Sequence, residues 1–148
     1  MIHVEASQII SARPEAIYAI FTDYRVSHPA ILPKPYFASL VVEEGGQGAG
    51  TVFRAQMDVM GTKTDLRMVV SEPQPGRVLR EEDETAGIVT TFTVEPVSAE
   101  ETRVTLATDF RSSPGLKGWI ESLLNPLITR RIYRQELQLV ADYVRQHP

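Results

Sequence analysis

The sequence predicts an α+β domain in which a seven-stranded antiparallel sheet is covered on one face by a long carboxy-terminal helix. Apolar and polar residues alternate along seven short segments that tight turns separate, and near the end of the chain the apolar spacing changes to three and four residues. A sheet with one apolar face needs a cover, and this last helix is the segment long enough to provide it.

The first elements are a strand and a short helix. Ile2–Ser11 is rich in β-branched residues and is predicted to be a strand. Pro14 occupies the first position of a helix that is expected to end at Asp23. One face of this helix is apolar, and its residues are Ala16, Ile17, Ile20 and Phe21. Tyr24–Pro35 contains three prolines, so a loop or a single helical turn is expected there.

Six further strands follow, because the apolar period becomes two from Tyr36 onward. Their predicted bounds are Tyr36–Glu44, Thr51–Met60, Lys63–Glu72, Arg77–Glu84, Ile88–Val97 and Glu101–Phe110. The connections are short and rich in glycine or proline, which is typical of an antiparallel meander. No repeat or linker interrupts this order, so residues 1–148 are expected to form one domain.

The carboxy-terminal helix is predicted to extend over Gly115–Gln146, with Glu136 and several arginines on its polar face. Pro126 interrupts the apolar pattern, and a proline inside a helix costs about 3 kcal/mol or more. Asn125 before it is a favourable cap for a new helix. The helix is therefore expected to be either kinked or broken at Pro126.

Composition excludes several classes of function. The formal net charge of −4 argues against general nucleic-acid binding, which needs a basic surface. The chain has no cysteine, so neither disulfide bonds nor thiolate chemistry are expected. No apolar run approaches the roughly 20 residues of a transmembrane segment. The first residues lack the features of a signal peptide, so a cytoplasmic location is expected.

Three stretches carry a resemblance to known proteins. They are SARPEAIYAIFTDY, in which a proline-marked turn leads into a short helix, the strand–turn–strand EPQPGRVLREED, and the last strand EETRVTLATDF. In this order they resemble the START/Bet v1-like (SRPBCC) superfamily, and within it the polyketide cyclase/dehydrase and lipid transport group. The resemblance covers nearly the whole chain. One departure is that many members have a tryptophan soon after the first helix, where this chain reads DYRVSHPAILP.

The resemblance implies a helix-grip fold, in which a curved sheet wraps around the long helix and encloses a cavity. Members bind lipids, sterols, polyketides, plant hormones or quinone-like molecules; some catalyse cyclisation or dehydration, and many only carry their ligand. A small hydrophobic molecule is therefore the expected partner. The expected ligand-binding wall consists of Ile17, Phe21, Phe53, Met57, Leu66, Met68, Phe92, Leu106, Trp119, Leu123 and Tyr133.

No strong catalytic signature is present, since neither a GxSxG nor an HExxH motif occurs. The glycine-rich EEGGQGAG precedes a strand rather than a helix, which indicates a hairpin turn and not a phosphate-binding loop. His3, His28 and His147 are far apart in the sequence, so no metal site is expected, and no cofactor is predicted.

His28 and Glu81 are the candidate catalytic residues. His28 follows the first helix near the expected cavity mouth, where a histidine can exchange protons near neutral pH, or it is simply an exposed loop residue. Glu81 shares one side of its strand with Leu79, so it is expected to face inward, where burial raises the pKa of a carboxyl group. The alternative places Glu81 near the rim, hydrated or paired with an arginine. Arg54 and Asp109 are weaker candidates because alternation directs both outward.

Three functions remain open at this point. The first is binding or carriage of a small hydrophobic ligand, and the second is a cyclase or dehydratase-type enzyme using the same cavity. An ionisable side chain inside the cavity would favour the enzyme, whereas a wall of carbon alone would favour carriage. The third is a protein-interaction module with an exposed apolar patch at Ile31, Leu32 and Tyr36. Either a monomer or a homodimer is compatible with the sequence.

Overall fold

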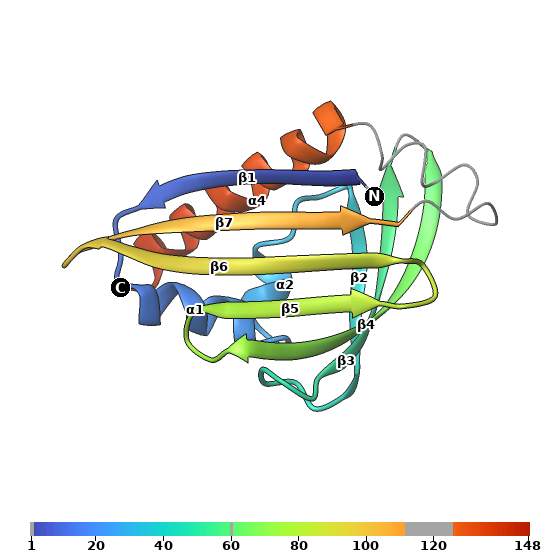
Figure 1. The fold of residues 1–148 in the computed structure, drawn as a ribbon, viewed down its shortest axis with the longest axis horizontal. Coiled ribbons are helices and arrows are strands. Elements are labelled where there is room, and N and C mark those ends of the chain that lie inside the picture. Colours follow the sequence, from blue (N-terminus) through green and yellow to red (C-terminus); the bar gives the residue numbers. More distant parts are fainter. Residues whose placement is uncertain (1, 60, 112–125) are drawn as a thin grey trace.

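The computed structural model describes residues 2–59, 61–111 and 126–148, and in these residues seven antiparallel strands form one sheet (Figure 1). The strands are β1 (Ile2–Ile10), β2 (Phe37–Glu44), β3 (Val52–Val59), β4 (Thr62–Gln74), β5 (Val78–Asp83), β6 (Ile88–Ser98) and β7 (Glu101–Phe110). Their spatial order is β1-β7-β6-β5-β4-β3-β2. The meander from β2 to β7 is thus as predicted, and β1 returns to pair with β7.

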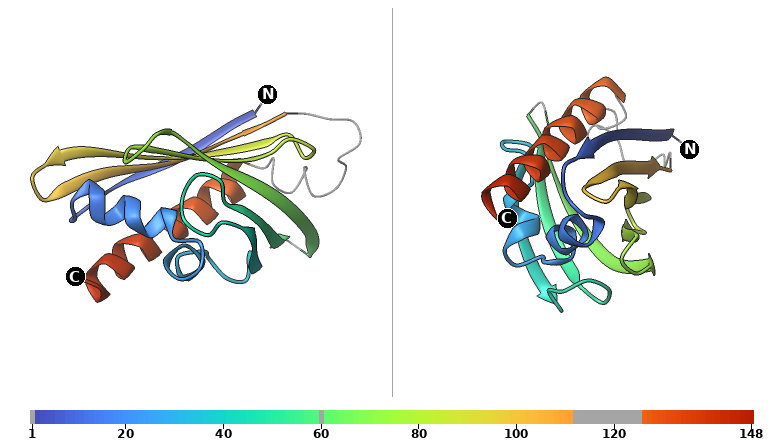
Figure 2. Two further views of the ribbon diagram at one scale, coloured as in Figure 1. Left: turned by 90° about the horizontal axis from the view of Figure 1, so that it is seen from below. Right: turned by 90° about the vertical axis from the view of Figure 1, so that its left-hand side faces the viewer.

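The helices are α1 (Pro14–Thr22), α2 (Ser27–Ala30) and α4 (Pro126–Gln146), and all three lie on the same side of the curved sheet (Figure 2). The predicted fold class, a curved seven-stranded antiparallel sheet with a carboxy-terminal helix and short helices after the first strand, is confirmed. Alternation gives the sheet its two faces: Phe53, Ala55 and Met57 are buried, whereas Arg54 between them is exposed.

Strand β4 is longer than predicted and continues through Pro73 to Gln74. Proline cannot donate a backbone hydrogen bond, so it is tolerated in a sheet only at edges and bulges. The register of β4 against β5 shifts between Ser71 and Gln74, and Pro73 lies within that irregularity. The bulge explains why a segment that reads as a turn remains part of the strand.

The short helices follow the expected signals. Pro14 is the first residue of α1, and Ile17 and Phe21 on its inner face are fully buried against β6 and the core. The proline-rich segment forms α2, a single helical turn. Ile31, directly after α2, is completely buried. Ile31 therefore cannot be part of the exposed apolar patch that would support a protein-interaction module, because this segment folds inward onto the core.

Helix α4 covers the sheet with one apolar face. Its 21 residues correspond to a length of about 30 Å. Ile132, Leu137 and Val140 are buried, and Arg131 and Arg134 are exposed. Glu136 was expected among the polar residues of the outer face, but it lies on the buried face. Trp119, Leu123 and the kink or break expected at Pro126 fall on, or depend on, residues outside those described. None of the helices in the described ranges is long and apolar enough to span a membrane.

We predict that Leu137→Ala lowers the free energy of unfolding by about 2–5 kcal/mol, because it leaves a cavity between α4 and the core. Arg134→Ala, on the exposed face of the same helix, should change it by no more than about 0.5 kcal/mol. Urea denaturation measures both values. Equal effects of the two substitutions would show that α4 is not packed on the sheet as described.

Candidate functional site

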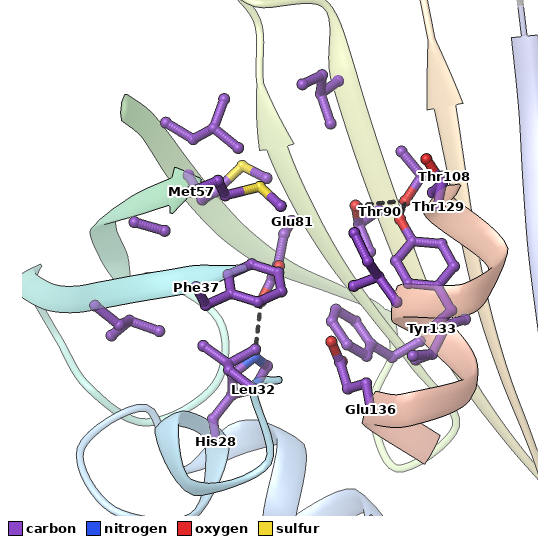
Figure 3. Close-up of a pocket in the computed structure, with 18 of the residues that line it drawn as sticks. His28, Leu32, Phe37, Met57, Glu81, Thr90, Thr108, Thr129, Tyr133 and Glu136 are labelled. Atoms are coloured by element: carbon purple, nitrogen blue, oxygen red, sulfur yellow. Dashed lines mark hydrogen bonds and ion pairs between the residues drawn. The ribbon is translucent and has the colours of Figure 1, made fainter. Parts of the chain in front are cut away.

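A pocket lies between the inner face of the sheet and α4, with α2 and the segment after it at one side (Figure 3). Most of its wall is apolar side chain from β2, β3, β4, β6 and β7. The cavity has a volume of about 70 Å³. This volume exceeds the roughly 10–15 Å³ that one water needs, so the pocket has room for a small organic group.

The structure places most of the predicted wall residues around this pocket. Those that line it are Phe53, Met57, Leu66, Met68, Phe92, Leu106 and Tyr133. Ile17 and Phe21, also predicted as wall residues, are not among them. The Phe21 ring packs against Phe92, with 4.9 Å between ring centroids, and so fills the core beneath α1 beside the pocket. Trp119 and Leu123 lie outside the described residues.

Glu81 reaches the pocket from β5 and is only 6% exposed. It faces inward as strand alternation predicts, so its placement at a hydrated rim is wrong. The Tyr24 hydroxyl donates a hydrogen bond of 2.6 Å to Glu81 Oε2. Burial raises the pKa of Glu81 to about 7, and the hydrogen bond from Tyr24 only partly opposes this shift. Glu81 can therefore gain or lose a proton near neutral pH.

His28 also lines the pocket and is 1% exposed, so the interpretation as an exposed loop histidine is wrong. Its ring stacks on Tyr24 at a centroid distance of 4.4 Å. Nδ1 lies 2.7 Å from the Phe21 carbonyl oxygen. Because a carbonyl only accepts, Nδ1 carries the proton and Nε2 keeps a lone pair. This lone pair lies 3.5 Å from Glu81 Oε2.

The contact between His28 and Glu81 joins two neutral groups between about pH 4 and pH 7, although its geometry fits an ion pair. Burial lowers the pKa of His28 to about 4, so the ring is uncharged near neutral pH. Burial likewise raises the pKa of Tyr24 well above 10, and its hydroxyl remains a donor. Of these three groups, Glu81 is the one whose charge changes near pH 7.

Helix α4 supplies the polar groups of the other wall. Tyr133 makes a short hydroxyl contact with Thr108, which in turn lies 2.8 Å from the Thr90 hydroxyl. Burial raises the pKa of Tyr133 far above its ordinary value of 10. Glu136, one helical turn further, lines the pocket and is 3% exposed. Burial first, and then the charge of Glu81, raise the pKa of Glu136 well above its ordinary value of 4.5.

The polar residue type of Glu136 suggested the outer face of α4, whereas its position in the helix places it on the buried face. A helical projection contains the necessary signal, since Glu136 follows Ile132 by four residues and precedes Val140 by four. Both of these neighbours are buried. Tyr24 was likewise not singled out as a partner for Glu81. Arg54 and Asp109 point outward as expected. Within residues 2–59, 61–111 and 126–148, no group of three or more His, Cys, Asp or Glu is arranged to hold a metal ion.

Residues 1–145 match the family described as polyketide cyclase/dehydrase and lipid transport. The chain belongs to the polyketide cyclase/dehydrase and lipid transport family. The resemblance read from the sequence is thereby confirmed for almost the full length of the chain. Comparison with curated proteins gave no significant match.

Solved structures of related fold agree with this family. The solution structure of the KanY protein is 29% identical, with a TM-score of 0.83 and 97% of each chain covered. The Zhui aromatase/cyclase from a Streptomyces species is 18% identical, with a TM-score of 0.74, over 97% of this chain and 93% of that one. Norcoclaurine synthase from Thalictrum flavum, solved with dopamine and hydroxybenzaldehyde, is 14% identical, with a TM-score of 0.71, over 99% and 87%. The last two likenesses show the fold that this family member shares with them.

We predict that Glu81 makes stability depend on pH. The pKa of Glu81 is about 7 in the folded protein against an ordinary 4.5, so its contribution to stability is complete below about pH 4.5 and is lost as the pH rises through about 7. The free energy of unfolding of the wild type relative to Glu81→Gln should therefore fall by about 3 kcal/mol over this range.

Urea denaturation across this pH range tests the expectation. Glu84→Gln, in the exposed turn after β5, is the matched control and should follow the wild type. Parallel pH profiles of the wild type and Glu81→Gln would contradict the burial of an ionisable Glu81.

Proposed function

We propose that the pocket binds a small, largely apolar carbonyl compound and that Glu81 moves a proton to and from the carbon next to its carbonyl group. The observation that carries this proposal is a carboxyl group with a pKa of about 7 inside an otherwise mainly apolar pocket. A general base is most effective when its pKa lies near the working pH. The reaction class is enolisation, followed by ring closure or loss of water where the substrate allows it.

Three features of the site support this chemistry. The hydrogen bond from Tyr24 fixes the position of Glu81 Oε2. The base is therefore already ordered before the substrate binds, and less conformational entropy is lost in the reaction. The His28 ring, which is stacked on Tyr24, lines this side of the pocket. The apolar wall excludes water from the proton transfer and would fold a flexible substrate so that its reacting carbons meet.

The names of related structures are compatible with this proposal. An aromatase/cyclase and a synthase solved with an aromatic amine and an aromatic aldehyde have the same fold. This fold can therefore support catalysis on aromatic or ring-forming compounds, and the family itself includes cyclases and dehydrases by description. The proposal for this chain depends on Glu81 and not on those names.

Carriage of a hydrophobic ligand is the second candidate, and the predominantly apolar wall favours it. Apolar burial contributes about 25 cal/mol per Å² before the costs of association, so a carbon-lined pocket suffices for binding. A carrier does not need an ionisable group in its pocket, however, and burying one costs free energy. The buried Glu81 therefore makes the enzyme the better-supported function.

We predict that the protein accelerates exchange of the protons next to the carbonyl of β-tetralone with deuterium from solvent, and that the rate rises with pH through about 7 as Glu81 ionises. Proton NMR in heavy water measures the exchange, and saturation-transfer NMR measures binding. Glu81→Gln should lower the rate by roughly 10²–10⁴-fold while β-tetralone still binds.

Glu84→Gln is again the control and should exchange at the wild-type rate. Binding of β-tetralone without exchange above the buffer rate would replace the enzyme with the carrier. Equal rates for Glu81→Gln and the wild type would eliminate Glu81 as the base.

A further inference from the structure

Glu136 is a buried carboxyl group that the proton transfer by Glu81 does not use. It comes from α4, whereas Glu81 comes from β5, and both lie in the wall of the same pocket (Figure 3). Its side chain is 3% exposed, and it lies on the helix face formed by Ile132, Tyr133 and Val140. A glutamate at such a position has lost its water and needs a partner.

Within the described ranges, no side chain donates a hydrogen bond to Glu136 and no basic residue pairs with it. The arginines nearest in sequence, Arg131 and Arg134, are on the exposed face of α4. The residues that line the pocket in those ranges include no lysine and no arginine. A lone carboxylate in such surroundings costs several kcal/mol. Burial and the charge of Glu81 raise the pKa of Glu136 accordingly, and the protonated form is favoured.

A protonated carboxyl group is a hydrogen-bond donor, and here it has no acceptor from the described part of the chain. Of the ionisable groups that line the pocket with it, His28 and Tyr133 are neutral near pH 7 because burial lowers the pKa of His28 to about 4 and raises that of Tyr133. Tyr24 is also neutral, and it donates to Glu81. Only Glu81 changes its charge in this range, and its ionisation holds the proton on Glu136 more firmly.

We propose that Glu136 is a second catalytic residue, whose carboxylic acid donates a hydrogen bond to the carbonyl oxygen of the ligand on the side of the pocket away from Glu81. This inference rests on the proposed function for the identity of the ligand as a carbonyl compound. It adds the orientation of that compound, with its oxygen toward α4 and the adjacent carbon toward β5. It also explains why an acidic residue occupies the centre of an apolar helix face.

The proton balance closes between the two carboxyl groups. Glu81 as carboxylate takes a proton from the carbon, the carbon–hydrogen electron pair forms the carbon–carbon double bond of the enol, and the carbonyl oxygen takes the proton of Glu136. When the enol carbon then bonds to a second carbonyl carbon of the same ligand, that second oxygen takes the proton from Glu81. The enol oxygen returns its proton to Glu136. Both groups end as they began, and a ring with a new hydroxyl group has formed.

A different ligand class would need the opposite protonation state. An apolar ammonium compound would pair with Glu136 as a carboxylate, stabilised by the surrounding aromatic faces. The surroundings favour a protonated Glu136 whose proton has no acceptor in the described residues, and this state suits a carbonyl ligand rather than an ammonium ligand. The two alternatives give different results when the carboxyl is replaced by an amide, because an amide still donates a hydrogen bond but never carries the negative charge.

The test compares Glu136→Gln with Glu136→Met, using β-tetralone and its hydrocarbon counterpart tetralin as probes. Isothermal titration calorimetry gives the affinities, and circular dichroism verifies the fold of each variant. Glu136→Gln should bind β-tetralone within about threefold of the wild type, and Glu136→Met about tenfold more weakly. Neither variant should alter the affinity for tetralin by more than about threefold. Loss of the Glu136 proton at high pH should lower the exchange rate of the wild type, and this fall should be absent from Glu136→Gln, whose amide does not ionise.

Several results would overturn the role of Glu136. An equal loss of tetralin and β-tetralone affinity would make it a packing residue only. If Glu136→Gln loses as much affinity for β-tetralone as Glu136→Met does, and only the wild type binds aminotetralin tightly, the site binds an ammonium group instead. Failure of β-tetralone to bind the wild type would contradict the proposal as well. If binding requires the carbonyl oxygen of β-tetralone but no proton exchange occurs, the role of Glu136 is supported and the function proposed for Glu81 is rejected. Failure of this inference can therefore be distinguished from failure of the proposed function.

Discussion

Burial of the Glu81 carboxyl group in an apolar pocket, held by one hydrogen bond from Tyr24, is the interaction on which the chemistry of this protein depends. Removal of water raises the pKa of Glu81 to about 7, and the hydrogen bond from Tyr24 is too weak to reverse that shift. The same loss of water keeps His28 neutral and raises the pKa of Glu136. One physical cause therefore sets the protonation state of every ionisable group that lines the pocket in the described ranges.

The fold makes this burial possible because it brings distant segments to one place. Tyr24 and His28 follow α1, Glu81 lies on a central strand, and Glu136 lies on α4 at the other end of the chain. The curved sheet supplies most of the apolar wall, and α4 closes it (Figure 2). Each functional group is carried by a regular element or by a segment packed against one, so its position is determined by core packing.

Much of the fold and part of the site are predictable from the sequence. Period-two alternation identifies the strands and places Glu81 inside, because a strand side chain has only two directions. The burial of His28 depends on its stacking against Tyr24 and its bond to the Phe21 carbonyl, tertiary contacts that no local pattern encodes. The burial of Glu136, in contrast, can be predicted from its position in the helix, and only its polar residue type suggests an exposed position. The burial of Ile17 and Phe21 is predictable from the helical spacing. Spacing and alternation do not show, however, whether a buried residue lies in the core or in the wall of the pocket.

The account rests on carboxyl groups that are uncharged in the folded protein at a pH where glutamate is normally ionised. Carbon-13 NMR of the glutamate side-chain carboxyl carbons, assigned with Glu81→Gln and Glu136→Gln, reports their protonation directly as the pH changes. The account predicts a midpoint near pH 7 for Glu81 and a midpoint well above 4.5 for Glu136. Midpoints close to 4.5 for both carboxyl groups would show that water reaches the pocket freely, and would contradict the account.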